Sequence, residues 1–324
     1  MPSPQIGIFS LGDPAHTYLE FRAKADVPAA DFVRAVAAIH EPHTTVGGVN
    51  LVIGFRPEIW RNASPGDAPA EVRSFERPIV GVEGFSMPAT QADLWLWIAG
   101  ASYDVVFDLA KEAIERLTPV ATLEREIAGW SYLHSRDLTG FEDGTENPNL
   151  LEAPAVALID DGPGAGGSVL LFQKWKHDTA SFHALPVEAQ ERVIGRTKPD
   201  SIELEGDAMP ADSHVSRTVI EEDGVEVDIF RRNVPYGTVS DHGTVFVGFS
   251  SHQRRLQRMI ERMTGAEGGI RDALTRYSTP LTGAYYFVPS VDALRRFAPE
   301  EEAGVRAVTA SARPRAVEAS NPAG

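Results

Sequence analysis

Hydrophobic residues recur through the first half of the chain in an order that predicts alternating strands and helices. Two helices are predicted, over residues 28–40 and 102–117. In the second of them, Val105, Leu109 and Leu117 belong to an i, i+4 apolar series. Four strands are predicted from short apolar or alternating runs, over residues 17–25, 47–55, 92–101 and 124–137. The predicted order is strand, helix, strand, strand, helix, strand.

The second half of the chain repeats this order. Helices are predicted over residues 186–197 and 252–265, and strands over residues 167–178, 243–252 and 282–290. Between them, residues 216–230 predict a hairpin that turns at Asp223 and Gly224, a dipeptide typical of two-residue turns. The repeated order predicts an α+β fold of two ferredoxin-like halves, each an antiparallel sheet with helices packed on it.

The boundaries of these halves follow from composition. The N-terminal half is predicted over residues 1–150 and the C-terminal half over residues 151–302, with a glycine-rich crossing near 150–166. Residues 303–324 are rich in Ala, Arg, Pro and Ser without periodicity, and we expect a disordered tail there.

The composition of the chain argues against several classes of function. The formal net charge of −16 disfavours binding to nucleic acid or to an anionic membrane surface. The chain has no cysteine, which excludes disulfides, thiol catalysis and iron–sulfur clusters. No apolar run reaches the roughly 20 residues that span a bilayer. The N-terminus shows no export signal, so we expect a cytoplasmic protein and leave homo-oligomerisation open.

The predicted hairpin gathers polar residues on one face. With a two-residue turn, residue 222 pairs with 225, and 216 pairs with 231. Alternation then places Arg231 and Asn233 at the end of an apolar face, together with His214 at the start of the first strand. Arg232 falls on the other face and is interpreted as an ordinary surface charge. A buried polar network that only fixes the sheet explains this grouping equally well.

A second group of polar residues lies in "TGFEDGTENP", residues 139–148. The segment sets Asp143 between two glycine-containing turns and adds Glu142 and Glu146. A plain turn requires neither three carboxylates nor a flanking phenylalanine. Glycine on each side allows the backbone to approach another group closely. Asp143 is therefore a candidate functional residue.

Five motifs together resemble the dye-decolourising peroxidase family. They are "GFEDG" with the following "TENP", "SHVSR", "RRNVPYG" and "TPLTGAYYFVPS". The resemblance extends to about residue 299, and the compact form without a secretion signal resembles the bacterial B-type branch. It implies a haem b, one per chain, bound mainly by the C-terminal half.

The resemblance also implies roles for individual residues. His214 is implied as the proximal ligand of the haem iron, and Asp143, Arg231 and Asn233 as catalytic residues at the peroxide site. Asp143 and Arg231 are expected at the cofactor as well, with Gly144 and Glu146. The second ring nitrogen of a metal-bound histidine needs a hydrogen-bond acceptor. Asp272 is our suggested acceptor for His214.

The implied activity is reduction of hydrogen peroxide with oxidation of bulky aromatic, phenolic or dye-like donors. One alternative is a haem-binding or haem-delivery protein without turnover. Another is a duplicated binding module without haem, in which His214 is a satisfied core residue. Glu142 and Glu146 could bind a cation such as manganese, although a solvated acidic rim is the simpler interpretation. The tail lacks an apolar peptide, so packaging in a protein nanocompartment is not predicted.

Overall fold

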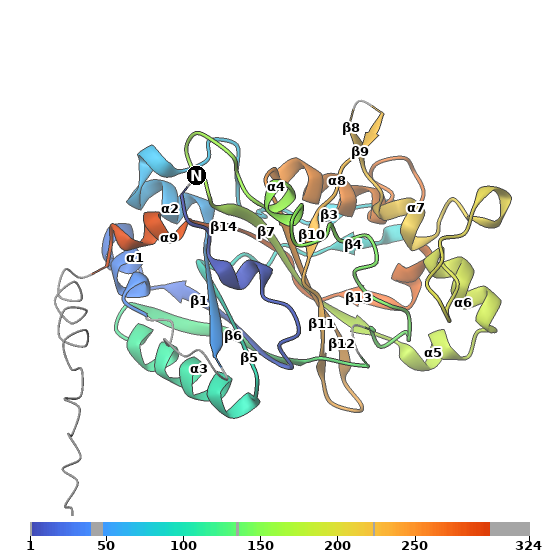
Figure 1. Ribbon diagram of the computed structural model, residues 1–324, viewed down its shortest axis with the longest axis horizontal. Coiled ribbons are helices and arrows are strands. Elements are labelled where there is room, and N and C mark those ends of the chain that lie inside the picture. The colour runs from blue at the N-terminus through green and yellow to red at the C-terminus, as the bar shows by residue number, and fades with distance from the viewer. Residues whose placement is uncertain (1, 40–47, 134–135, 223, 299–324) are drawn as a thin grey trace, which may run out of the picture.

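The computed structural model describes residues 2–39, 48–133, 136–222 and 224–298 (Figure 1). Its helices are α1 (Ala29–Ala37), α2 (Pro57–Ala63), α3 (Tyr103–Leu117), α4 (Ala153–Ala157), α5 (Thr179–His183), α6 (Val187–Ile194), α7 (His214–Thr218), α8 (Gln253–Thr264) and α9 (Val291–Arg295). The strands are β1 (Ala15–Ala23), β2 (Val49–Phe55), β3 (Ile79–Val80), β4 (Ser86–Met87), β5 (Leu94–Gly100), β6 (Ala121–Trp130), β7 (Ser168–His177), β8 (Glu221–Glu222), β9 (Val225–Glu226), β10 (Phe230–Arg231), β11 (Val234–Gly237), β12 (His242–Ser250), β13 (Ser278–Pro280) and β14 (Ala284–Val288).

Two antiparallel four-stranded arrangements with the same strand order make up most of the ten-stranded sheet, and the short strands β10 and β13 lie at the ends of its order. In the N-terminal half the spatial order is β6-β1-β5-β2, and in the C-terminal half it is β14-β7-β12-β11. Numbered within each half, both orders are fourth, first, third, second. This is the ferredoxin-like arrangement, so the predicted α+β duplication is confirmed. The predicted boundary at residue 150 lies in the connection between β6 and β7.

The two halves meet at two seams. Tyr236 of β11 pairs with Gly129 of β6, and Phe287 of β14 pairs with Phe55 of β2. Because β7 also pairs with β12, the strands close into a ring around a buried interior. Large aromatic side chains from both halves fill this interior, among them Tyr18, Trp95, Trp97, Phe172, Phe230 and Tyr286.

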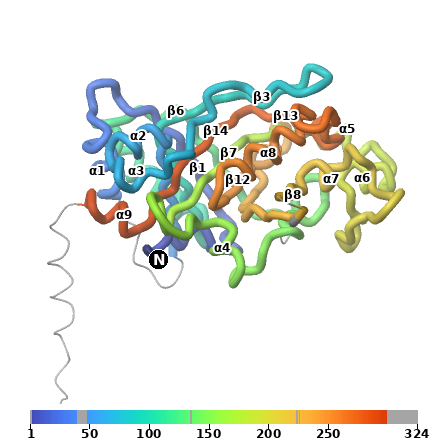
Figure 2. The backbone as a smooth tube through the Cα atoms, turned by 90° about the horizontal axis from the view of Figure 1, so that it is seen from above, coloured from blue at the N-terminus to red at the C-terminus, as the bar shows by residue number. Residues whose placement is uncertain are grey.

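The outer faces of the two halves are covered differently. On the N-terminal half, α1, α2 and α3 bury an apolar face against β1, β2 and β5. On the C-terminal half, α8 packs on β7 and β12, and its buried face includes Leu256 and Ile260. Helices α5, α6 and α7 lie at one end of the molecule, far from α1 and α9 at the other end (Figures 1 and 2).

The hairpin prediction is partly wrong. The expected pairing of Glu222 with Val225 forms, and Asp223 itself lies outside the described residues. The expected pairing of residue 216 with 231 does not form, because His214–Thr218 is the short helix α7 rather than a strand. The Ser213 hydroxyl accepts a hydrogen bond from the Ser216 backbone N–H at 3.2 Å and so caps this helix. Serine before a helix is a common N-cap, and this signal overrides the strand pattern.

The interpretation of Arg232 as a surface charge is wrong as well. Arg232 is only 8% exposed, and it donates a hydrogen bond to the Ile8 carbonyl at 3.1 Å. Its guanidinium carbon lies 5.2 Å from the centre of the Trp97 ring. Burial lowers its pKa to about 10. The strand alternates as predicted, but the face opposite Arg231 turns into the interior between the two halves instead of into solvent.

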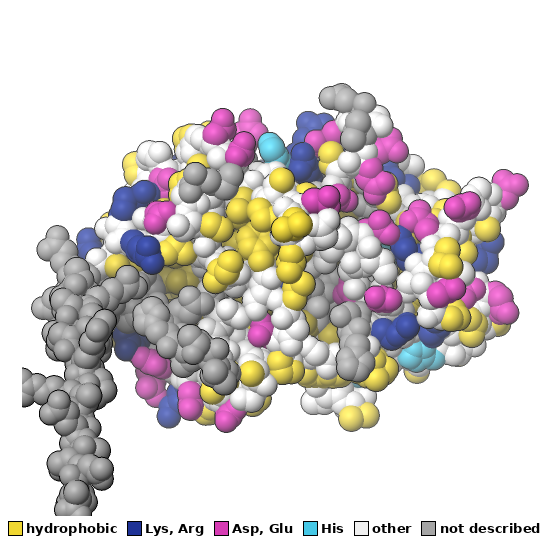
Figure 3. All heavy atoms as spheres, viewed as in Figure 1, with side chains coloured by type: hydrophobic (Ala, Val, Ile, Leu, Met, Phe, Trp, Pro, Cys, Tyr) yellow, Lys and Arg dark blue, Asp and Glu magenta, His cyan; other side chains and the backbone are white. Residues whose placement is uncertain are grey.

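Acidic side chains are spread over the molecular face in Figure 3, as the net charge of −16 leads one to expect. Across the described ranges, no helix is long and apolar enough to cross a membrane. His40, His43 and the predicted tail at 303–324 lie outside the described residues.

Candidate active site

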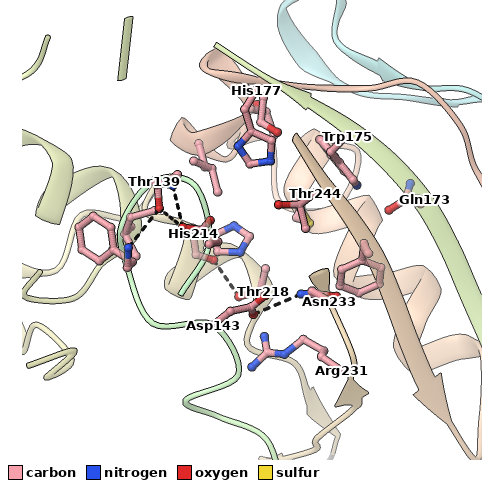
Figure 4. Close-up of a pocket in the computed structure, with 18 of the residues that line it drawn as sticks. Thr139, Asp143, Gln173, Trp175, His177, His214, Thr218, Arg231, Asn233 and Thr244 are labelled. Atoms are coloured by element: carbon pink, nitrogen blue, oxygen red, sulfur yellow. Dashed lines mark hydrogen bonds between the residues drawn. The ribbon is translucent and has the colours of Figure 1, made fainter. Parts of the chain in front are cut away.

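A cavity of about 880 Å³, including its open mouth, lies on the outer face of the C-terminal sheet (Figure 4). Its walls come from β7, β12, α6, α7, α8 and the loop around residues 137–143. About a third of its described lining residues are apolar, namely Phe141, Trp175, Ile194, Phe246, Met259, Met263 and Leu274. A lining that combines apolar side chains with a few converging polar groups is typical of cofactor sites. The remaining lining residues are polar, and they include four of the predicted site residues, namely Asp143, His214, Arg231 and Asn233.

His214 begins α7 and lines this cavity. Its Nδ1 lies 2.7 Å from the Oδ2 atom of Asp272, which is fully buried. The other oxygen of Asp272 accepts the Leu274 backbone N–H at 2.8 Å, so the carboxylate has a fixed orientation. This geometry confirms the suggested hydrogen bond between Asp272 and His214. A donor at Nδ1 leaves Nε2 as the ring nitrogen with a free lone pair in the neutral imidazole.

Two opposing influences act on the pKa of His214. Burial is the largest and lowers it, because a charged ring is poorly solvated there. The negative charge of Asp272 and the hydrogen bond to it raise it, and together they hold the pKa of His214 above its usual value.

Asp143 faces the same cavity from the loop that follows β6. Asn233 Nδ2 donates to Asp143 Oδ1 at 3.2 Å. The orientation of the Asn233 amide is determined by the Val247 backbone N–H, which donates to Asn233 Oδ1 at 3.1 Å. Burial raises the pKa of Asp143, and the charge of Arg231 only partly offsets this effect, so the net shift is upward. The sequence had left the direction of this shift open.

Arg231 is the last residue of β10 and Asn233 lies between β10 and β11. Both line the cavity, so they face the same side as alternation predicted. Arg231 Nε is buried and has no hydrogen-bond partner among the described residues. An unpartnered guanidinium nitrogen is costly to bury unless a ligand or water pairs with it. The cavity therefore presents a hydrogen-bond donor and a positive charge beside the Asp143 carboxylate.

Two further predicted residues lie beside the cavity rather than in its lining. Gly144 and Glu146 line a neighbouring pocket that shares Asp143, His214 and Arg231 with it. The Glu146 carboxylate forms an ion pair with Arg196, which also bonds Glu203 at 2.8 Å. A contact of Gly144 or Glu146 with haem remains a prediction.

The manganese suggestion has no support in the part of the chain that the structure describes. Glu142 lines the cavity, but no group of three His, Asp or Glu side chains there is arranged to hold a metal ion.

Sequence reasoning missed several residues of this site. Asp137 lines the cavity and accepts the Thr139 backbone N–H at 2.8 Å, and burial raises its pKa. His177 also lines the cavity, and burial lowers its pKa to about 4. The spacing of Gln173, Trp175 and His177 along one strand could have revealed this second group, since alternate residues share a face.

Two family models match this chain. Residues 21–131 match the N-terminal domain of the Dyp-type peroxidases, and residues 134–293 match the C-terminal domain. The chain belongs to the Dyp-type peroxidase family. The C-terminal match begins before Asp143 and extends beyond His214, Arg231 and Asp272, so it covers every residue of the site.

Similar proteins agree with this assignment. The dye-decolorizing peroxidase of Mycolicibacterium paratuberculosis is 37% identical over 279 residues, which are 80% of this chain and 78% of that protein. DyPB from Rhodococcus jostii RHA1 is 37% identical with a TM-score of 0.82, and the match covers 90% of this chain and 97% of that chain. A variant of that DypB in complex with heme is 35% identical with a TM-score of 0.83, covering 89% and 97% of the two chains.

The protein is a haem peroxidase, and its cavity suits haem. His214 supplies an imidazole whose second nitrogen is already bonded, the lining offers apolar surface for a macrocycle, and Arg231 supplies a buried donor without a partner. A Yersinia pestis deferrochelatase matches at only 23% identity over 238 residues. The relatives of higher identity are peroxidases, so the haem-delivery alternative is not favoured.

Proposed function

We propose that His214 binds the iron of haem b through Nε2, with Asp143 and Arg231 acting on hydrogen peroxide in the same cavity. The observation that carries this proposal is the arrangement of two preorganised groups around one space. The first is the His214–Asp272 pair, and the second is Asp143 with Asn233 and Arg231.

Asp272 keeps His214 competent as a ligand. Its carboxylate accepts the proton of Nδ1, which selects the tautomer with the lone pair on Nε2. A carboxylate in this position also makes the imidazole a stronger electron donor and restricts its rotation. Because Asp272 is fully buried and tied to the Leu274 backbone, the ring orientation is set before haem binds.

Asp143 is the proton-transfer residue of the proposal. Its ionised carboxylate accepts a proton from one oxygen of hydrogen peroxide and returns it to the other oxygen, which leaves as water. The Asn233 amide donates to Oδ1, which leaves Oδ2 available for this proton. The Arg231 guanidinium stabilises the negative charge that develops on the departing oxygen. The redox chemistry is supplied by the bound haem.

The reducing substrates that we propose are bulky aromatic donors, including phenols and dyes. Family membership supports peroxide and a reductant as substrates. An encapsulated Dyp-type peroxidase of Mycobacterium smegmatis has a TM-score of 0.84 to this chain. We do not extend encapsulation to this protein, and a cytoplasmic location stays a prediction.

Stopped-flow mixing with peroxide tests the assignment in D143A, R231L and R232L. The measured quantity is the rate at which the Soret absorbance changes. We expect D143A to be slower by on the order of 10²–10⁴ and R231L by on the order of 10²–10³. R232L is the matched control, because Arg232 is adjacent in sequence but points into the interior on the opposite face.

The pH dependence of this rate follows from the pKa of Asp143. The carboxylate must be ionised, and its pKa is raised above the ordinary value of about 3.9. We expect the rate to fall on the acid side at a pH above that value, and this limb to disappear in D143A. A slow R232L would show that the wrong arginine is assigned. Parent-like rates in all three variants would contradict the assignment of both distal residues.

A further inference from the structure

We propose that Asn147 is a positioning residue that holds the loop carrying Asp143 against the strand carrying Arg231. The inference deepens the proposed function, since it concerns the same two distal residues. Asn147 is in the "TENP" segment, and its side chain reaches a strand 84 residues further along the chain.

The contact is a reciprocal pair of hydrogen bonds. Asn147 Nδ2 donates to the Arg231 carbonyl at 2.8 Å, and the Arg231 backbone N–H donates to Asn147 Oδ1 at 2.8 Å. A primary amide that bonds both groups of one residue reproduces the pairing that a neighbouring β-strand would make. The Asn147 side chain therefore takes the place of one residue of a neighbouring strand.

The position of this contact in the sheet explains why it is needed. Strand β10 is the last strand of the sheet order and pairs only with β12 among the described strands. The neighbouring residue Arg232 directs its N–H to Val247 of β12 at 2.8 Å, so Arg231 directs its own N–H and carbonyl away from β12. Buried backbone groups without partners are costly, and Asn147 satisfies both.

The other end of Asn147 is tied to the Asp143 loop. Its backbone N–H donates to the Gly144 carbonyl at 3.0 Å, which closes a tight turn directly after Asp143. Gly144 has a φ of 81°, and a Cβ atom there would lie 3.0 Å from Asn147 Nδ2. Glycine at 144 thus allows the left-handed turn and leaves room for the amide.

The loop that carries Asp143 and the strand that carries Arg231 are therefore joined by two contacts. Asn147 bonds the Arg231 backbone, and Asn233 bonds the Asp143 carboxylate at 3.2 Å. Arg231 Nε has no hydrogen-bond partner among the described residues. The position of the guanidinium therefore depends mainly on where the Arg231 backbone is held. A displacement of about 1 Å in a catalytic group can reduce a rate by about 10²-fold. Loss of the amide pair should consequently slow the peroxide step.

Three variants of the full haem-loaded chain test this role. N147A removes both hydrogen bonds. N147D keeps the shape, but an ionised carboxylate cannot donate to the Arg231 carbonyl, whereas a protonated one can. N149A is the matched control, because the Asn149 side chain caps the Leu151 and Glu152 backbone N–H groups of the same segment at 3.0 and 3.2 Å without touching Arg231.

The first readout is amide hydrogen exchange of the peptide around Arg231, which does not depend on activity. We expect faster exchange there in N147A and unchanged exchange in N149A. The second readout is the rate of the peroxide step, with roughly a 10–100-fold decrease in N147A. In N147D the deficit relative to the parent should be large at neutral pH and should shrink as the introduced carboxyl is protonated in acid. A residue that only supports folding would not produce this rescue.

The outcomes separate the two proposals. Unchanged exchange at Arg231 in N147A would overturn the hydrogen-bond pair itself. Faster exchange with a parent-like peroxide rate, while D143A and R231L are slow, would overturn the positioning role and leave the proposed function intact. Parent-like rates in D143A and R231L would overturn the proposed function first, and the positioning role with it.

Discussion

The two halves of the molecule share one strand order but use the outer face of the sheet in opposite ways. In the N-terminal half, the segment between the first and second strands is residues 24–48, and its described part contains the single helix α1. In the C-terminal half, the corresponding segment is residues 178–233, and its described part contains α5, α6, α7, the β8–β9 hairpin and the two-residue strand β10. Helices cover the outer face of the N-terminal sheet, whereas the outer face of the C-terminal sheet borders the cavity.

This difference shows how a duplicated fold acquires an active site. The helix α3 packs its apolar stripe directly on the N-terminal sheet, with Ala113 and Leu117 buried. On the outer face of the C-terminal sheet α8 packs on β7 and β12, while α6 and α7 lie across the cavity from these strands. The longer insertion brings His214 to this cavity, and the loop after β6 brings Asp143 to it. The N-terminal half keeps its packing and therefore provides the rigid support.

The largest expected effect is the loss of haem when His214, the proposed axial ligand, is replaced. H214A should fold but lose nearly all bound haem, because no other histidine among the described residues of the cavity lining has a ring nitrogen bonded to a buried carboxylate. The ratio of Soret to protein absorbance after purification measures this loss. H242A is the control, since His242 bonds Thr179 and Thr238 outside the cavity lining. Equal haem content in H214A and the parent would contradict the ligand assignment.

Removal of haem should affect the two halves unequally. A ligand that binds only the folded state stabilises it by mass action, so the haem-free protein should melt at a clearly lower temperature. Hydrogen exchange should increase in α6 and α7, which line the cavity, and change little in α1 and α3. An equal increase in both halves would mean that the N-terminal half depends on haem as well.

Two substitutions, one in each half, should compare the packing of the N-terminal core with the packing beside the cavity. L109A on α3 removes atoms from a packed core and should destabilise the haem-free protein by about 2–5 kcal/mol in urea unfolding. M263A on α8 should cost less, because Met263 lines the cavity and has fewer packed neighbours on that side. With haem present, M263A should instead weaken haem retention. A larger loss in M263A than in L109A would show that the cavity is packed like the core.

The smallest expected effect is electrostatic. Burial raises the pKa of Asp143 in the folded chain, so the unfolded chain ionises first as pH rises above about 3.9. Stability from this residue is present below that pH and is lost as pH rises through the folded-state pKa. D143N should therefore raise the melting temperature of haem-free protein at pH 7 and have no effect near pH 3.5. A lower melting temperature for D143N at pH 7 would contradict this sign.

The sequence by itself determined the elements and most of the site. Local periodicity is a property of neighbouring residues, so the helices over 102–117 and 252–265 and the strands of the N-terminal half were predictable, whereas β11 of the C-terminal half was not predicted. Strand alternation also placed Arg231 and Asn233 on one face correctly. Asp143 and His214 were found through motifs, because the chemistry of a site restricts residue types over a few adjacent positions.

Only the tertiary structure decided what faces each side chain. Alternation separated Arg231 from Arg232 but could not reveal that both faces of this strand are covered, which depends on a second sheet far away in sequence. The helical conformation of His214 came from the Ser213 cap, which competed with a strand pattern of similar strength. The bond from Asn147 to Arg231 joins residues that no local pattern relates. Hydrogen bonds and burial between distant segments arise from packing, and packing is decided by the whole chain.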